Sequence, residues 1–165
     1  MNYFSYFKLP EKFDINIKKL SKKYYSLQKK YHPDFFVNCS SKKKKNVLKK
    51  SIYINKGYKT LKDPLKRMQY ILKLNGFNLK STKININLDQ SFLNKQFKYY
   101  QKLNKIQKNP NSSQKINSFY NQIDQLKKKY QKKILKKFKE KSWKKSFLIF
   151  QKILFLNNFQ KKIKT

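Results

Sequence analysis

The only histidine in this 165-residue chain stands in the tripeptide His32-Pro33-Asp34. Pro33 disfavours helical backbone at His32, so the tripeptide is predicted to form the tip of a loop that displays both side chains. The Asp34 carboxylate would offer a partner arginine two acceptor oxygens. For so short a motif, an ordinary helix end with Asp34 as a turn acceptor is the simpler alternative.

Other chemistry has little to build on. Cys39 is the only cysteine and stands seven residues from His32, which leaves a Cys–His dyad as one option but excludes an internal disulfide. One Cys and one His cannot complete a four-ligand zinc site or hold an iron–sulfur cluster unaided. The chain has only seven acidic residues in addition to this Cys and His. We therefore predict that it has no catalytic residues, no metal site and no cofactor, and that it is not an enzyme.

Helices must position the tripeptide. Residues 17–30 place Leu20, Tyr24 and Leu27 on one face and lysines on the other, and either Asp14 or Asn16 can cap them. Residues 42–62 repeat apolar positions in a three-four alternation, the seam of an antiparallel partner: Val47, Ser51, Ile54, Tyr58 and Leu61. Gly57 in that helix suggests close packing.

Two shorter helices complete this half. One is expected over 2–9, where Tyr3 and Phe7 face inward together and Pro10 ends it. The other should begin at Pro64 behind an Asp63 cap and end at Asn75-Gly76.

The second half begins with a weakly alternating segment, 78–89, for which a linker is favoured over a strand. Helical patterns follow over 90–108 and 114–139 and from Ser142, with a break at 109–113. Short breaks between three patterned helices predict an antiparallel bundle. The chain is therefore predicted to be all-α, with domains over 1–76 and 89–165 and a linker over 77–88.

The net charge of +36 invites a nucleic-acid partner, and a lysine-rich nucleic-acid binder is kept as a rival of another class. However, Arg67 is the only arginine, and base readout favours the arginine fork. The excess of Lys, Asn, Ile, Phe and Tyr, without one alanine, is typical of an AT-rich genome. We predict no specific nucleic-acid binding, although weak salt-sensitive adhesion to polyanions would follow from the charge.

The chain is predicted to be cytoplasmic and to bind no membrane. Its strongest apolar run, Phe147–Phe155, is interrupted by Gln151 and Lys152 and is too short to span a bilayer. Lys8 and Pro10 interrupt the apolar start of the chain, which does not read as a signal peptide.

The first 79 residues resemble the J-domain co-chaperones, and among them the HscB/Jac1 type of iron–sulfur cluster biogenesis. The residues that carry the resemblance are Tyr3-Phe4, Phe7-Lys8-Leu9-Pro10, Leu27-Gln28, His32-Pro33-Asp34, Ser51, Asn55, Tyr58, Thr60-Leu61, Asp63-Pro64-Leu65, Arg67, Tyr70, Leu72 and Gly76 through Leu79. Beyond residue 80 the resemblance rests on layout and a few apolar positions.

The resemblance implies a partner. J-domains dock on the nucleotide-binding and linker region of an Hsp70 and stimulate its ATP hydrolysis, and the HscB type acts on a specialised Hsp70, HscA. It implies that His32, Pro33 and Asp34 form the trigger, and that Tyr24, Tyr25, Ser26, Lys29 and Lys30 lie on the docking helix. With Lys22 and Lys23, these lysines could steer an acidic partner, or simply form a solvated face.

It also implies that the C-terminal bundle binds the scaffold protein IscU. Local patterns place the scaffold-binding residues at Leu93, Phe97 and Phe155, for which plain bundle core is the alternative. Two departures from the family matter: Lys98, Gln101 and Lys102 stand where the family carries glutamates, and Phe35 follows the tripeptide where Lys or Arg is common. A generic J-domain protein with another client is the nearest rival.

Overall fold

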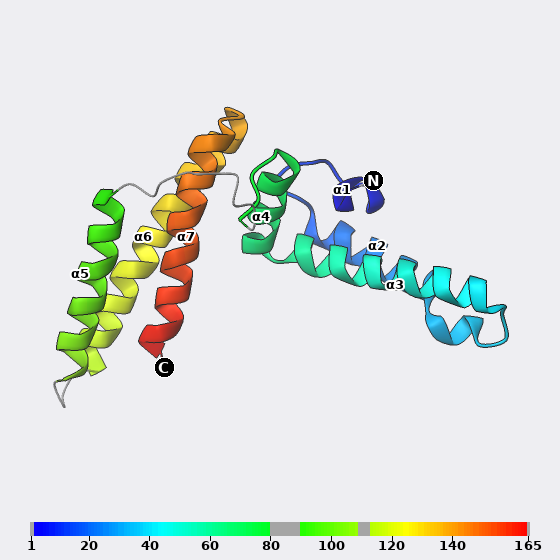
Figure 1. The fold of residues 1–165 in the computed structure, drawn as a ribbon, viewed down its shortest axis with the longest axis horizontal. Coiled ribbons are helices and arrows are strands. Elements are labelled where there is room, and N and C mark those ends of the chain that lie inside the picture. The colour runs from blue at the N-terminus through cyan, green and yellow to red at the C-terminus, as the bar shows by residue number, and fades with distance from the viewer. Residues whose placement is uncertain (1, 80–89, 109–112, 165) are drawn as a thin grey trace. The chain divides into compact units, whose positions relative to one another are not determined.

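The computed structural model describes residues 2–79, 90–108 and 113–164. These residues are mostly helical and include no β-strand, so the predicted all-α class is confirmed (Figure 1). The chain divides into two compact units, Met1–Leu74 and Asn75–Thr165, each described by itself below. Most of the predicted 77–88 linker, the strand alternative and most of the predicted break at 109–113 lie outside the described residues, and the predicted domain boundaries stay a prediction.

The N-terminal unit is built on an antiparallel helix pair, α2 (Ile17–Tyr31) and α3 (Ser41–Lys62) (Figure 1). A 3-10 helix, η1 (Pro33–Phe36), lies at the end where the chain passes from one to the other. The short helices α1 (Tyr3–Tyr6) and α4 (Pro64–Leu74) both pack on α3. The pair thus carries His32-Pro33-Asp34 at one end, as the sequence predicted.

Local sequence explains where these helices begin. Asn16, rather than Asp14, caps α2, because its Oδ1 accepts a hydrogen bond from the Lys19 amide at 2.9 Å. Asp63 caps α4 as predicted, accepting from the Lys66 amide at 2.9 Å. The helix expected over 2–9 is shorter than predicted: it ends at Tyr6, since the backbone turns at Lys8 with φ 51.

The core of this unit follows the predicted seam. Leu20 of α2 is fully buried against the inner face of α3, on which Val47, Ser51, Ile54, Gly57 and Leu61 are buried. Gly57 is where α1 approaches α3: a Cβ added there would lie 2.9 Å from Tyr3 Cδ1 and 3.0 Å from Phe7 Cε2. The close packing that this glycine suggested is confirmed.

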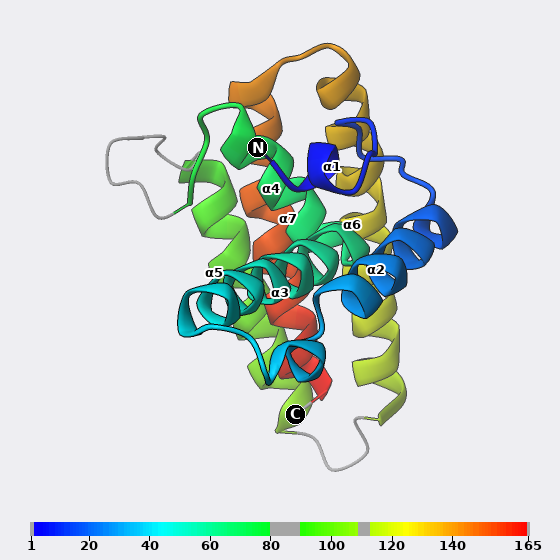
Figure 2. The ribbon, with the colours of Figure 1, turned by 90° about the vertical axis from the view of Figure 1, so that its right-hand side faces the viewer.

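The C-terminal unit contains three long helices, α5 (Gln90–Gln107), α6 (Ser113–Lys139) and α7 (Trp143–Lys164), which run side by side (Figure 2). They bury a shared apolar cluster of six side chains: Leu103, Phe119, Ile123, Leu156, Phe159 and Ile163. The three-helix bundle is confirmed. Among the described residues, none of the helices is long and apolar enough to cross a bilayer.

Candidate functional site

The candidate site is the tip at the end of the α2–α3 pair. Helix α2 ends at Tyr31 because His32 takes extended backbone (φ −69, ψ 129) in front of Pro33, which begins η1. The Phe35 amide then donates to the His32 carbonyl oxygen at 3.2 Å. This turn presents both polar side chains to solvent, with relative exposures of 47% for His32 and 82% for Asp34.

Within the tip, His32 Nδ1 lies 3.5 Å from Asp34 Oδ2, which is an ion-pair distance when the imidazole is protonated. The imidazole and the Phe35 ring form a T-shaped pair with a centroid distance of 6.0 Å and an interplanar angle of 68°. An exposed carboxylate held in this way suits a charge-assisted hydrogen bond to a cation on a partner. It does not suit proton transfer in a water-excluded pocket.

The sequence offered two other kinds of chemistry near the tip, a reactive thiol and a metal site. Cys39 is a free, half-buried thiol. Within residues 2–79, 90–108 and 113–164, the His, Cys, Asp and Glu side chains form no group of three or more that could hold a metal ion.

Contacts with α3 hold the tip in place. The Lys50 ammonium lies 4.9 Å from the ring centroid of Tyr31, the last residue of α2. On the other side, the Lys43 ammonium lies 5.8 Å from the Phe36 ring in η1. Two α3 lysines thus brace the segments directly before and after His32-Pro33-Asp34.

The docking-helix residues predicted from the resemblance divide into two groups. Tyr25, Ser26, Lys29 and Lys30 are exposed on the outer face of α2 that leads to the tip. Tyr24 instead turns inward, where its hydroxyl donates to Asn55 Oδ1 at 2.8 Å. Tyr24 thus positions α2 against α3. Of the five predicted docking-helix residues, it is the one whose contact with a partner this structure favours least.

The predicted scaffold-binding residues also divide. Leu93 and Phe97 lie one turn apart on α5 with relative exposures of 40% and 64%, so these two side chains lie on the surface. Phe155 of α7 is half-buried among other rings, 5.7 Å from both Phe92 and Phe159. Its ring is continuous with the bundle core.

Comparison with known proteins bears on both units. A family model described as "DnaJ domain" matches residues 2–70, and one described as "HSCB C-terminal oligomerisation domain" matches residues 88–164. The co-chaperone protein HscB of Buchnera aphidicola is 42% identical over 165 residues, covering 99% of this chain and 94% of its own. The chain belongs to the HscB family of J-domain co-chaperones. That membership implies an Hsp70 partner and a place in iron–sulfur cluster biogenesis, and the family is one of co-chaperones, not of enzymes.

Solved HscB structures share the fold. The chaperone HscB from Vibrio cholerae is 27% identical with a TM-score of 0.86, and the alignment covers 99% of this chain and 96% of that one. The human co-chaperone HscB gives the same identity and TM-score, with coverage of 99% and 81%.

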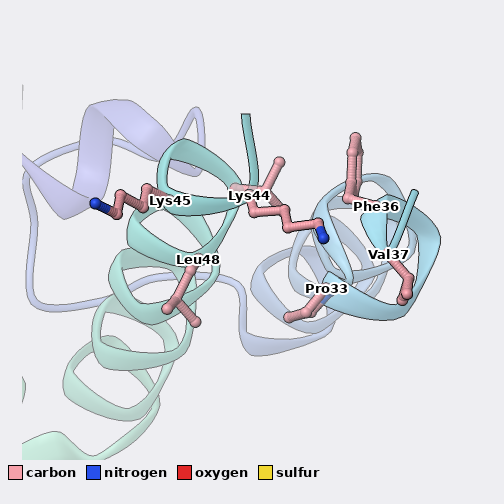
Figure 3. A pocket seen from close by; sticks show the side chains of 7 residues that line it. Pro33, Phe36, Val37, Lys44, Lys45 and Leu48 are labelled. Atoms are coloured by element: carbon pink, nitrogen blue, oxygen red, sulfur yellow. The ribbon is translucent and has the colours of Figure 1, made fainter. Parts of the chain in front are cut away.

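One feature beside the HscB tip was not predicted from the sequence. A hollow of about 340 Å³ opens between η1 and α3 (Figure 3), lined by Pro33, Phe36, Val37, Lys44, Lys45, Val47 and Leu48. The sequence signal for it was Leu48, an apolar residue that, like Ile52, falls outside the α3 seam. That signal says nothing about what lies opposite, because η1 takes its place only in the folded unit.

Proposed function

We propose that this chain stimulates the ATPase of a specialised Hsp70 of the HscA type and delivers an IscU-type scaffold protein to it. The observation that carries the proposal is the exposed His32-Asp34 tip, braced at the end of a lysine-faced α2 in a chain of the HscB family. The match over 88–164 supports an HscB-type client over that of a generic J-domain protein. The cytoplasmic location predicted from the sequence is part of this proposal.

Stimulation would work through binding alone. The Asp34 carboxylate would accept hydrogen bonds from a cationic side chain of the Hsp70, and Lys29 and Lys30 would attract an acidic surface beside it. If these contacts form better with the hydrolysis-competent state, the co-chaperone shifts the Hsp70 population toward that state. No chemistry by this chain is required.

Scaffold binding would use the exposed apolar residues of α5. Leu93 and Phe97 present side chains to solvent that a partner could cover. Their surroundings are basic rather than acidic: Lys98 and Lys102 are exposed, and Lys102 is held by Gln122 at 3.1 Å. We propose that apolar contact carries this interaction here, with a cognate scaffold of altered charge.

The Hsp70 part is tested by single-turnover ATP hydrolysis with the cognate HscA-type Hsp70 at physiological salt. The wild-type chain should accelerate hydrolysis, and His32→Gln and Asp34→Asn should abolish the acceleration. Asn38→Ala, in the same exposed connection but outside the tripeptide, is the matched control and should act like the wild type. Equal acceleration by His32→Gln and the wild type, or no acceleration by either, would contradict the proposal.

The scaffold part is tested by titrating the IscU-type protein against the full chain in a calorimeter. The double substitution Leu93→Ser with Phe97→Ser should weaken binding at least about tenfold, because two apolar contacts are lost. Lys95→Ser, at an exposed position on the other side of the same helix, is the control and should leave the affinity unchanged. An unchanged affinity of the double variant for the scaffold would contradict a scaffold site on α5. The same variant should still stimulate the Hsp70 ATPase in the absence of scaffold, which would show that its J-domain is functional.

A further inference from the structure

Apolar side chains that the N-terminal unit leaves exposed gather beside the tip. Val37 after η1, and Leu48 and Ile52 on α3, have relative exposures of 63%, 50% and 57%. Leu48 and Ile52 are four residues apart and therefore share one helix face. We call these three residues the apolar strip.

The strip borders the hollow between η1 and α3. Val37 and Leu48 line its two sides, and the nearly buried Val47 also contributes to its lining. Figure 3 shows Leu48 and Pro33 on the facing elements, with the Lys44 side chain reaching from α3 toward η1. The walls of the hollow are thus largely apolar, and Lys44 brings one ammonium group to it, whereas the Lys45 side chain points away from η1 (Figure 3).

Charge indicates what kind of group fits. Two of the seven lining residues are lysines, Lys44 and Lys45, and none is acidic. Neither lysine takes part in any ion pair among the described residues. The Lys44 ammonium beside apolar walls is complementary to a segment that combines an apolar side chain with a carboxylate.

The hollow is also continuous with the tip, since Pro33 belongs to both. A protein bound to His32 and Asp34 would also cover the neighbouring apolar strip with an adjacent part of its surface. A separate partner would have to share this small area with the first. Continuity therefore favours one occupant for the tip and the hollow together.

We propose that an apolar side chain from an acidic segment of the Hsp70 partner inserts into this hollow, which extends the docking surface from the tip onto the outer face of α3. This inference rests on the proposed Hsp70 function. It adds Leu48 and Ile52 as apolar residues that determine the affinity for the Hsp70, and Lys44 as the residue that contributes electrostatic attraction. Its contribution is to binding, whereas His32-Pro33-Asp34 is the trigger.

The test measures how single-turnover ATP hydrolysis by the HscA-type Hsp70 depends on co-chaperone concentration. Leu48→Gln with Ile52→Gln should raise the half-saturating concentration at least about fivefold and leave the maximal rate unchanged. Lys44→Gln should raise it less and reduce its dependence on salt. Ile17→Gln is the matched control, because Ile17 is also an exposed apolar residue but lies on α2 at the end away from the tip.

A direct readout accompanies the kinetics. Cys39→Ser removes the only thiol, so that Ile52→Cys can carry an environment-sensitive dye in the full chain. Its emission should shift to the blue when ATP-bound Hsp70 is added, and a dye at Ile17→Cys should not shift.

The outcomes separate the two proposals. If the wild type stimulates and His32→Gln does not, but the double variant has an unchanged half-saturating concentration and the dye at position 52 does not respond, the inference is overturned and the proposed function stands. If the wild type does not stimulate at all, both are overturned. If sedimentation shows a wild-type dimer that the double variant loses, the strip is occupied by a second copy of the chain and the inference is wrong.

Discussion

Tyr24 of α2 lies flat on Tyr58 of α3, with ring centroids 3.9 Å apart and an interplanar angle of 11°. The same pair of helices is joined by hydrogen bonds on either side of the stack. Asn55 Oδ1 accepts from the Tyr24 hydroxyl and from Gln28 Nε2 at 2.8 and 2.7 Å, and Ser21 Oγ lies 3.2 Å from the Tyr58 hydroxyl. These polar contacts set the register of the pair and hence the place of the tip.

Asn55→Ala should destabilise the N-terminal unit by about 1–3 kcal/mol, because two half-buried donors lose their shared acceptor. Native-state hydrogen exchange of α2 and α3 amides measures this, since the chain's single tryptophan lies in the other unit. Lys56→Ala, an exposed neighbour, is the control. Equal protection in the two variants would show that the Asn55 bonds contribute nothing.

Gly57→Ala should destabilise the same unit, by about 1 kcal/mol net. Alanine gains helix propensity of about 1 kcal/mol, but overpacking costs about 1–3 kcal/mol. The new Cβ would lie 2.9 Å from the Tyr3 ring, which is itself stacked on Tyr70, and 3.0 Å from the Phe7 ring.

The cause can be isolated with a second substitution. In a Tyr3→Ala background, where the ring is gone, Gly57→Ala should cost less than in the wild type. The same cost in both backgrounds, again by hydrogen exchange of α3, would place the strain elsewhere.

Arg67→Lys should cost about 1–3 kcal/mol although it keeps the charge. The Arg67 side chain is buried, its Nη1 donates to the Leu61 carbonyl oxygen at 2.6 Å, and its guanidinium lies 4.7 Å from the Phe13 ring centroid. Burial lowers the pKa of Arg67, and nearby Asp14 and Asp63 oppose that shift. A strongly hydrated lysine ammonium tolerates this site less well than a planar guanidinium.

Protection of α4 amides against hydrogen exchange is the measurement for Arg67→Lys. Lys66→Arg, which makes the reverse change at the exposed neighbouring position, should leave protection unchanged. If Arg67→Lys also left the protection of α4 amides unchanged, an arginine would not be required at this position.

Asp124 should make the C-terminal unit sensitive to acid. Hydrogen bonds from Lys128, Gln160 and Lys127 lower the pKa of Asp124 from 3.8 to about 2. Because the folded-state pKa is the lower one, the ionised carboxylate stabilises the fold above about pH 4, and this stabilisation is lost as the pH falls toward 2.

Trp143 fluorescence reports on this unit, so thermal unfolding followed by it between pH 6 and 2 checks the prediction. Asp124→Asn should lower the Tm at pH 6 and flatten the loss of Tm in acid. Asp34→Asn, in the other unit, should leave both features unchanged. If the Tm of Asp124→Asn fell in acid as steeply as that of the wild type, the loss of stability would be due to other carboxyl groups.

Much of the HscB architecture could be predicted from local sequence. The apolar period of α2 and α3 depends only on which residues recur each turn, so their seam, their ends at Pro33 and Pro64 and the exposure of the tip followed from residue types. The three bundle helices followed in the same way.

Tertiary structure decided what periodicity could not. Tyr24, Leu93, Phe97 and Phe155 all fit an apolar face, but only packing shows that Tyr24 and Phe155 turn inward while Leu93 and Phe97 stay exposed. The hollow beside the tip depends on η1 lying against α3, which brings Val37 to Leu48 across a change of chain direction. Sequence determines what each helix can bury, whereas contact with the partner helix determines which residues it leaves for another protein.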